Sequence, residues 1–439
     1  MYHFVGIKGA GMSSLAQMLK ELGYEVQGSD LPKHFFTEKG LVECHIPFYS
    51  YNANNIHPGM TIVRGASITD DHPEIIKAKE LDLPIITYEE MLGKLTRESK
   101  AVCVAGCHGK TTTTSMLSHV LGPVKGVNYL VGDGTGFALK GNEYFILESC
   151  EYRRHFLNYT PYYAVITNID LDHVDYYRDI DDIVDAYESF AKNATHMVIA
   201  CGDDPYTHRL QVETPLKFYG FKEDDDIRAT DVVYSENGTS FDVTIDGNAY
   251  GHFDLPLYGK HQVYDALATI AVCYYESVTA EEVQKYFCTF GGARRRFEET
   301  RAGNSIIIDD YAHHPNEVKA TITAIQQKYP HHKIVAVFQP HTFSRTLEFA
   351  KDIAKALTEV DKAYIMDIHP ARESQQDFPG VTSDLIIHNL TNGAHISMED
   401  ADILYRERDA VYIFMSPNDV SKLELVFCFV QDTFLVLYK

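Results

Sequence analysis

A lysine and a run of threonines follow a glycine turn in the segment AVCVAGCHGKTTTTSML, residues 101–117. An apolar stretch typical of a strand leads into the turn, and an apolar helical pattern follows it. Such a turn can hold phosphate, because Lys110 would place a positive charge on the β- and γ-phosphate oxygens and the Thr111 hydroxyl could bind Mg²⁺. The common phosphate loop has four residues between its glycines, whereas only two separate Gly106 from Gly109. The segment therefore predicts a phosphate loop of a shorter kind.

The backbone of this loop offers further donors. We expect the N–H groups of residues 107–111 to point at the phosphates, because the first N–H groups of a helix have no acceptor inside the helix. The residues predicted to contact the nucleotide phosphates are Gly106, Cys107, His108, Gly109, Lys110, Thr111 and Thr112.

Acidic residues end two of the apolar stretches that follow the loop. Glu148 ends the stretch YFILE and is the first candidate for a metal-binding carboxylate. Glu151, three residues later, is the alternative candidate. The carboxyl ends of parallel strands meet at the edge where the phosphate loop lies, so Glu148 is placed to bind Mg²⁺, which prefers oxygen ligands. The next stretch ends in TNIDLDH and brings more polar groups to the same edge: Asn168, Asp170, Asp172 and His173.

Basic and imidazole groups follow at three later places. One arginine of the triplet Arg294, Arg295 and Arg296 could reach a γ-phosphate, although a solvated basic surface is the alternative. At two expected strand ends, DDYAHHP and QPHTFSR, histidines could position a substrate and an arginine could bind a carboxylate through two parallel hydrogen bonds. Ordinary polar loop residues are the alternative for this second set, which comprises Asp309, Asp310, His313, His314, His341 and Arg345.

A second glycine turn lies near the start of the chain, in the segment GIKGAGMSS. Gly9 and Gly11 let the backbone approach a diphosphate, which the N-terminus of the next helix would hold. Asp30 ends the following strand, where a dinucleotide fold binds a ribose hydroxyl. Ser14 replaces the third glycine of the usual pattern, so the nucleotide need not be NAD, and a turn that merely packs is the alternative. The predicted residues are Gly9, Ala10, Gly11, Met12, Ser13 and Asp30.

Two phosphate loops in one chain need a common explanation. A dehydrogenase or a kinase needs one nucleotide, whereas a ligase that uses ATP to join a nucleotide-linked substrate to a second molecule needs two. An NAD-dependent oxidoreductase that uses only the first loop, and a nucleotide-binding protein without catalysis, are the alternatives from other classes.

The composition limits the partners and the compartment. The formal net charge is −23 over 439 residues, so we expect no nucleic acid and no anionic membrane as a partner. The eight cysteines form no C-x-x-C pair, which argues against zinc and for reduced thiols in the cytoplasm. We expect no signal peptide, and the apolar tail LVFCFVQDTFLVLYK is too short to span a bilayer, so it predicts a buried strand or helix.

The elements that must position these residues alternate between strands and helices, which is typical of parallel sheets covered by helices. A stretch with NG and DGN turns, residues 229–256, predicts antiparallel strands added to the middle sheet. We therefore predict an α/β protein of three domains: a Rossmann-like N-terminal domain, 1–98, a central P-loop-type ATPase domain, 99–299, and a C-terminal Rossmann-like α/β domain, 300–439.

Several of these motifs resemble the Mur ligases of peptidoglycan synthesis. GCHGKTTTTS, TNIDLDH, RRRFE, DDYAHHP and HTFSR occur in this order in that family, whose ATP loop has the same short spacing. Within the family, GIKGAGMSSLA and CEYRRHF are most similar to the members from Gram-positive bacteria that join L-alanine to UDP-N-acetylmuramate. The resemblance extends to about residue 415.

The resemblance implies that the first domain binds UDP-N-acetylmuramate, the central domain ATP and Mg²⁺, and the third L-alanine; a related ligase for another amino acid or a peptide is the alternative. For ATP and magnesium it implies phosphate contacts from Lys110 and from Arg295 or Arg296, metal contacts from Thr111, Glu148 and His173, and adenine contacts from His261 and Asp265. For the other substrates it implies a UDP site at Gly9, Gly11 and Asp30, an amino-acid site at His341 and Arg345, and a reaction centre beside His313 and His314.

Two segments depart from the family's pattern. In GKHQVYDA, Gln262 and Asp265 replace asparagines of the adenine segment. Because an ionised aspartate only accepts hydrogen bonds, we expect weaker ATP binding or a compensating contact. SPND, residues 416–419, replaces a glycine-rich turn, and since Pro417 lacks an N–H, this loop cannot make the same backbone contacts to a substrate.

Overall fold

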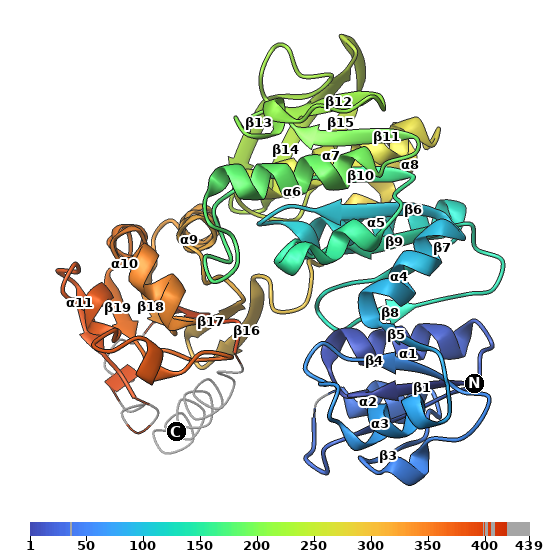
Figure 1. Ribbon diagram of the computed structural model, residues 1–439. Coiled ribbons are helices and arrows are strands. Elements are labelled where there is room, and N and C mark those ends of the chain that lie inside the picture. Colours follow the sequence, from blue (N-terminus) through green and yellow to red (C-terminus); the bar gives the residue numbers. More distant parts are fainter. Residues whose placement is uncertain (36, 398, 400–402, 405–408, 419–439) are drawn as a thin grey trace.

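Three separate β-sheets, each covered by helices, make up the computed structural model (Figure 1). The structure describes residues 1–35, 37–397, 399, 403–404 and 409–418, so the element predicted in the apolar tail lies outside the described residues. The three α/β units confirm the predicted fold class. Across the described part of the chain, no helix has the length and apolar character needed to cross a membrane.

The first sheet contains five parallel strands in the order β3-β2-β1-β4-β5. Gly28 in β2 lets the glycine turn pack closely, because a Cβ there would lie 2.5 Å from the Ile7 side chain. The elements are β1 Tyr2–Val5, α1 Ala10–Glu21, β2 Val26–Asp30, α2 Glu38–Glu43, β3 Phe48–Ser50, the 3₁₀ turn Ala53–Asn55, β4 Thr61–Arg64, α3 Pro73–Glu80, β5 Ile85–Thr87 and α4 Tyr88–Arg97.

The second sheet contains ten strands in the order β15-β14-β13-β12-β11-β10-β6-β9-β7-β8. Its middle is parallel, and the antiparallel strands β13, β14 and β15 extend one side, as the turn signals predict. The elements are β6 Lys100–Ala105, α5 Lys110–Lys125, β7 Val127–Leu130, β8 Gly136–Phe137, β9 Tyr144–Glu148, the 3₁₀ segment Tyr152–Asn158, β10 Tyr163–Ile166, α6 Ile180–Lys192, β11 Met197–Cys201, the 3₁₀ turn Thr207–Arg209, β12 Leu216–Gly220, β13 Ile227–Ser235, β14 Gly238–Ile245, β15 Asn248–Leu255, α7 Lys260–Tyr275 and α8 Ala280–Phe287.

The third sheet contains six strands in the order β16-β17-β21-β18-β19-β20, and only β16 is antiparallel to its neighbour. The elements are β16 Glu298–Ala302, β17 Ser305–Asp310, α9 Pro315–Lys328, β18 Lys333–Phe338, α10 Phe343–Leu357, β19 Lys362–Ile365, the 3₁₀ turn Gln375–Asp377, α11 Asp384–Ile387, β20 Gly393–His395 and β21 Ala410–Met415. The domain boundaries predicted after residues 98 and 299 stay predictions.

The first two domains share an apolar core. Met91, Leu92 and Leu95 of α4 belong to the same buried cluster as Phe156 and Tyr159 of the central domain. Burial of such side chains stabilises the contact by about 1.5–3 kcal/mol each. The N-terminal domain is therefore fixed against the central domain by apolar packing.

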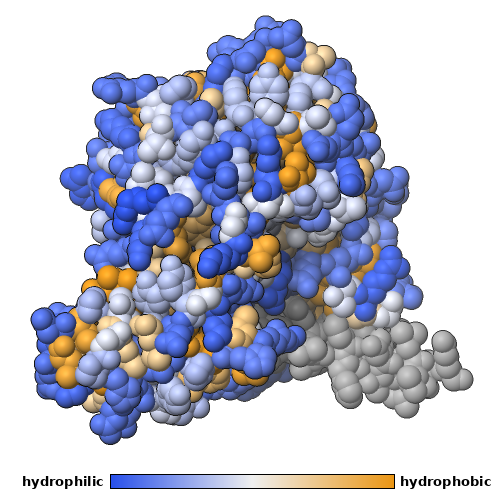
Figure 2. All heavy atoms as spheres, turned by 90° about the vertical axis from the view of Figure 1, so that its right-hand side faces the viewer, coloured by the Kyte–Doolittle hydropathy of each residue, from blue (hydrophilic) through white to orange (hydrophobic). Residues whose placement is uncertain are grey.

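The C-terminal domain has its own apolar clusters and meets the central domain through polar groups. The segment between β10 and α6 carries four aspartates, and three of them pair with different parts of the C-terminal domain. These pairs are Asp170 with Asn316 at 2.6 Å, Asp172 with Arg345 at 2.6 Å and Asp175 with Arg372 at 2.8 Å. Figure 2 shows the hydrophilic character of one molecular face, with apolar side chains scattered among charged ones.

Candidate active site

Two glycines that tolerate no side chain shape the phosphate loop. Gly106 has a φ of 141°, and a Cβ there would overlap the hydroxyl of Thr167. Gly109 has a φ of 80°, and a Cβ there would lie 2.6 Å from Oδ1 of Asp265. Only glycine combines this backbone conformation with so close an approach. The short spacing therefore gives a turn that lies tightly between β10 and α7 before α5 begins.

Asn168, at the end of β10, holds this turn in place. Its Oδ1 accepts from the N–H of His108 at 3.0 Å, and its backbone oxygen accepts from the N–H of Cys107 at 3.3 Å. The expectation that these two N–H groups face phosphate is wrong, because Asn168 occupies both. The N–H groups of residues 110–112 open α5 without a helical acceptor, so they are the ones that can face a ligand.

Lys110 forms a buried ion pair at the start of α5. Its Nζ lies 2.9 and 3.0 Å from the two carboxylate oxygens of Glu151 and also donates to the backbone oxygens of Gly106 and Cys107. Burial opposes both charges, but Glu151 raises the pKa of Lys110, and Lys110 together with His173 lowers the pKa of Glu151. Lys110 is therefore a cation at the loop throughout the physiological pH range.

Two carboxylates flank the loop with different partners. Oε2 of Glu148 accepts from the N–H of Gly132 at 2.7 Å, and burial raises the pKa of Glu148 against the effect of Lys110. Oε1 of Glu151 lies 3.4 Å from Nε2 of His173. Glu151, the alternative candidate from the sequence, therefore contacts the predicted metal ligand His173, and Glu148 does not.

The residues present fit a magnesium ion. Thr111, Glu148, Glu151 and His173 line one cavity, and hydroxyl and carboxylate oxygens are the ligands that Mg²⁺ prefers. Nδ1 of His173 is buried and has no hydrogen-bond partner within the described ranges. The set therefore offers the right donors, and the assignment of Thr111, Glu148 and His173 as ligands stays a prediction.

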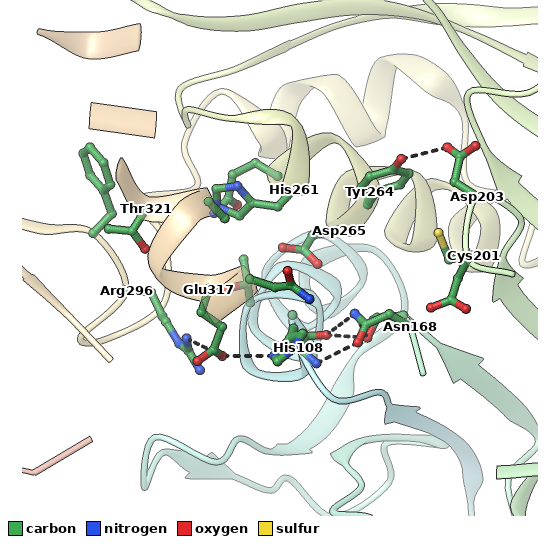
Figure 3. Close-up of a pocket in the computed structure, with 18 of the residues that line it drawn as sticks. His108, Asn168, Cys201, Asp203, His261, Tyr264, Asp265, Arg296, Glu317 and Thr321 are labelled. Carbon is green, nitrogen blue, oxygen red and sulfur yellow. Dashed lines mark hydrogen bonds and ion pairs between the residues drawn. The ribbon is translucent and has the colours of Figure 1, made fainter. Parts of the chain in front are cut away.

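A cavity of about 410 Å³, which we call the α7 cavity, opens beside the loop (Figure 3). Figure 3 shows His261 and Asp265 of α7 on one side, with Arg296, Glu317 and His108 on the other. Burial, with Arg296 adding to it, lowers the pKa of His261 to about 4. Burial raises the pKa of Asp265 to about 7, although its Oδ1 accepts from the hydroxyl of Thr113 at 2.8 Å.

His108 links the central and C-terminal domains across this cavity. Its Nδ1 lies 3.5 Å from Glu317 and its Nε2 lies 3.4 Å from Asp170. Burial opposes the charge, but these two carboxylates raise the pKa of His108 to about 9. The ring of His314 lies 4.5 Å from that of His108 between ring centres, tilted by 38°, and the two histidines with Asp170 could hold a metal ion. The ion pairs of His108 account for this cluster without one.

A second space of about 290 Å³, the central cavity, adjoins the first. The two share Gly109, Arg296 and Glu317. Predicted site residues from distant parts of the sequence meet around the central cavity, which is lined by Cys107, Lys110, Thr111, Glu148, Glu151, Asp172, His173, Arg294, Arg296, His313, His341 and Arg345, among others.

The arginine triplet divides into two groups. Arg296 lies 3.4 Å from Glu317 and lines both cavities, while Arg294 lines the central cavity. Arg295 lines neither of them: it pairs with Asp309 at 3.0 Å, and its Nη atoms donate to the backbone oxygens of residues 416–418. Of the two arginines expected at the ATP phosphates, only Arg296 lies at the cavities.

The two histidines of DDYAHHP have different surroundings. His313 lines the central cavity, whereas His314 is 3% exposed, caps the N-terminus of α9 and lies behind His108. His341 also lines the central cavity, and burial, with His313 and Arg345, lowers its pKa to about 3. His341 is therefore neutral at physiological pH.

Arg345 is already paired with a carboxylate of the central domain. Its Nη2 and Nε lie 2.6 and 3.2 Å from Oδ1 of Asp172, and its Nη1 lies 3.1 Å from Nδ1 of His341. The side chain is buried, at 6% exposure. Burial would raise the pKa of Asp172, but Arg345 lowers it well below the usual value. The carboxylate that Arg345 was expected to take from a substrate is supplied here by the chain itself.

A third space of about 110 Å³, the α1 cavity, lies between the first two domains. It shares Gly132 and Glu148 with the central cavity and reaches Gly11 at the start of α1. The three cavities therefore adjoin one another, from the first glycine loop, past the phosphate loop, to α7.

Of the six residues predicted to face the UDP moiety, Met12, Ser13 and Asp30 are buried, whereas Gly9 and Ala10 are exposed. Oδ2 of Asp30 accepts from the N–H of Lys8 and its Oδ1 from the N–H of Leu31, both at 2.7 Å, and Asp30 is 6% exposed. Gly9 caps α1, and Met12 and Ser13 are buried. Gly11 is the member of this predicted set that lines the α1 cavity.

Sequence reasoning missed three residues of the C-terminal domain: Asn316, Arg372 and Glu317, which pairs with His108 and Arg296. Nδ2 of Asn316 lies 2.6 Å from Asp170, and Arg372 lines the central cavity. Asn316 comes two residues after DDYAHH, so a longer reading of that motif could have included it. Arg372 belongs to no motif that was singled out, and a lone arginine in a loop gives no signal of its own.

Three α/β domains, with a phosphate loop that lines two of three adjoining cavities, are typical of an ATP-dependent ligase. Family models agree: the catalytic-domain model of the Mur ligase family matches residues 1–100, the Mur ligase middle domain 104–273, and the glutamate ligase domain of Mur ligases 295–412. The chain belongs to the Mur ligase family, the ATP-dependent ligases of peptidoglycan precursors.

Solved structures of this family share the fold. The UDP-N-acetylmuramate–alanine ligase MurC of Thermotoga maritima matches with a TM-score of 0.80 and 26% identity, over 98% of this chain and 99% of its own. A murein peptide ligase of Psychrobacter arcticus matches with a TM-score of 0.69 and 20% identity, over 98% of both chains. The MurF ligase of Thermotoga maritima, in complex with ADP, matches with a TM-score of 0.65 and 18% identity, over 94% and 96%.

Proposed function

We propose that this enzyme joins L-alanine to the lactyl carboxylate of UDP-N-acetylmuramate, with conversion of ATP to ADP and phosphate. The observation that carries the proposal is the row of adjoining cavities, with Lys110 at the middle one. ATP would lie with its nucleoside in the α7 cavity and its γ-phosphate in the central cavity. The sugar nucleotide would approach from the α1 cavity.

Activation of the carboxylate is the first step. A carboxylate oxygen is a poor leaving group, so the lactyl carboxylate attacks the γ-phosphorus of ATP, and an acyl phosphate forms as ADP leaves. Lys110 and Arg296 stabilise the negative charge of the transferring phosphoryl group, because they line the cavity in which it develops. Thr111, His173 and the carboxylate of Glu148 or Glu151 would hold Mg²⁺, which would supply further neutralisation of the phosphate charge.

Amide formation is the second step. The neutral amine of L-alanine attacks the acyl carbon, and phosphate leaves. His313 and His341 line this side of the cavity and position the amine. The pairs that Asp170 and Asp172 make with the C-terminal domain hold it over the site and exclude water from the acyl phosphate.

A panel of amino acids tests this proposal. Phosphate release is measured with ATP, Mg²⁺ and UDP-N-acetylmuramate, and each amino acid is added in turn. We expect release to require both the sugar nucleotide and L-alanine. Release with another amino acid or a tripeptide would instead assign a related ligase, and binding of ATP and the sugar nucleotide without turnover would assign a non-catalytic protein. The oxidoreductase alternative has no support, since the family consists of ligases.

A further inference from the structure

Two arginines of the C-terminal domain reach the central cavity, and they differ in how far their donors are used. The donors of Arg345 are committed to Asp172 and His341, in a buried position. Removing one partner from a buried ion pair is strongly destabilising, because the other charge stays buried without compensation. A substrate carboxylate that displaced Asp172 would leave that aspartate buried without its partner.

The guanidinium of Arg372 is hydrogen-bonded to the protein along only one of its edges, within the part of the chain that the structure describes. It lies between β19 and α11, and its Nε and Nη2 donate to one oxygen of Asp175 at 3.1 and 2.8 Å. Its Nη1 has no hydrogen-bond partner among the residues that the structure describes. Its guanidinium lies 4.5 Å from the ring centre of Tyr152, and its side chain is 44% exposed. A planar arginine held on one edge and open on another is suited to bind a further carboxylate.

The neighbouring charges favour the same residue. Lys110, Arg296 and Arg345 each face a carboxylate of the chain, respectively Glu151, Glu317 and Asp172. Arg372 contacts its aspartate near the surface, where an ion pair contributes little to stability. It also lies close enough to His341 to contribute to the lowered pKa of that histidine. Of these four cations of the central cavity, Arg372 therefore accommodates an anion most readily.

We propose that Arg372 binds the α-carboxylate of the incoming amino acid, and that Arg345 is a positioning residue that holds His341 and the two domains in register. This inference rests on the proposed function. It assigns substrate binding to a residue outside the HTFSR motif. It also explains why the amine of the amino acid would lie near His341.

The test compares L-alanine with L-alaninamide, which has the amine but no carboxylate. Phosphate release is measured for the wild type, Arg372→Ala, Arg372→Lys and the control Arg153→Ala. Arg153 is exposed and also lies against Tyr152, 5.4 Å from its ring centre, but it does not line the central cavity. We expect the wild type to prefer L-alanine in kcat/KM by about 10- to 100-fold, the range for a hydrogen bond to a charged group.

Arg372→Ala should raise KM for L-alanine by about the same factor and remove most of this preference, with kcat and KM for ATP nearly unchanged. Arg372→Lys should keep part of the preference, and Arg153→Ala all of it. A preference for L-alanine that survives in Arg372→Ala, with an active wild type, overturns the inference alone. A wild type that releases phosphate without any amine overturns the proposed function, and the inference with it.

Discussion

The two glycine loops of this chain each lead into a helix, but they differ in where their charged groups find partners. In the first loop, Lys8 donates from Nζ to the backbone oxygens of Leu31 and Lys33 and pairs with Glu38 at 2.8 Å, all within the N-terminal domain. In the central loop, Lys110 pairs with a carboxylate from beyond β9, and His108 reaches the C-terminal domain. The first loop is satisfied within its own domain and acts as a rigid support, whereas the second joins separate parts of the chain around the cavities.

Replacement of the central lysine gives the largest expected effect. Lys110→Ala should reduce the rate of phosphate release by at least about 100-fold, because a charge on the transferring phosphoryl group is worth roughly 3 kcal/mol or more. The rate is measured at saturating ATP, sugar nucleotide and L-alanine.

The matched variant is Lys8→Ala, in the first loop. It should lower the melting temperature, since it breaks a largely buried ion pair, and leave kcat within about twofold, as expected for a residue away from the chemistry. Equal losses of kcat in Lys8→Ala and Lys110→Ala would contradict the conclusion that the first loop is structural and the second takes part in catalysis.

The two carboxylates beside the central loop give the next effect. Glu151→Gln should raise the Mg²⁺ concentration needed for half-maximal activity by about 10- to 100-fold, the range for groups that orient metal ligands, because Glu151 contacts both Lys110 and His173. Glu148→Gln should have a smaller effect if Glu148 mainly holds Gly132. The reverse order would restore Glu148 as the principal carboxylate at the metal.

Much of the architecture could be predicted from the sequence, because strand–helix alternation and the hairpin turns are local signals. The sequence could not decide whether Glu148 or Glu151 lies beside His173, since both stand at or just beyond the end of the same strand. Only the fold shows that Glu151 contacts this histidine. The pairing of Arg345 with Asp172 joins residues 173 positions apart and has no local signal. For the same reason Arg372 was missed: its importance comes from the cavity it lines and from no pattern around it.

Asp30 tests the supporting role of the first loop. Its carboxylate accepts from two backbone N–H groups, so Asp30→Asn should lower the free energy of unfolding by about 1–2 kcal/mol. Thermal unfolding measures this change, and KM for the sugar nucleotide serves as the second readout. A KM that rises with no loss of stability would show that Asp30 contacts the nucleotide after all.

Asp265 gives the smallest expected effect, and it depends on pH. Its carboxyl is held neutral up to pH of about 7 by burial, and a neutral carboxyl can donate and accept as an amide does, whereas the ionised form only accepts. Asp265→Asn should therefore lower KM for ATP by about three- to tenfold at pH 8, where Asp265 is ionised, and change it little at pH 6. The pKa in the folded chain lies above that of the unfolded chain, so the wild type loses stability as pH rises from about 4 to about 7, and the variant does not. If KM for ATP is the same in both proteins at both pH values, adenine does not contact Asp265, and the α7 cavity holds the nucleoside in another orientation.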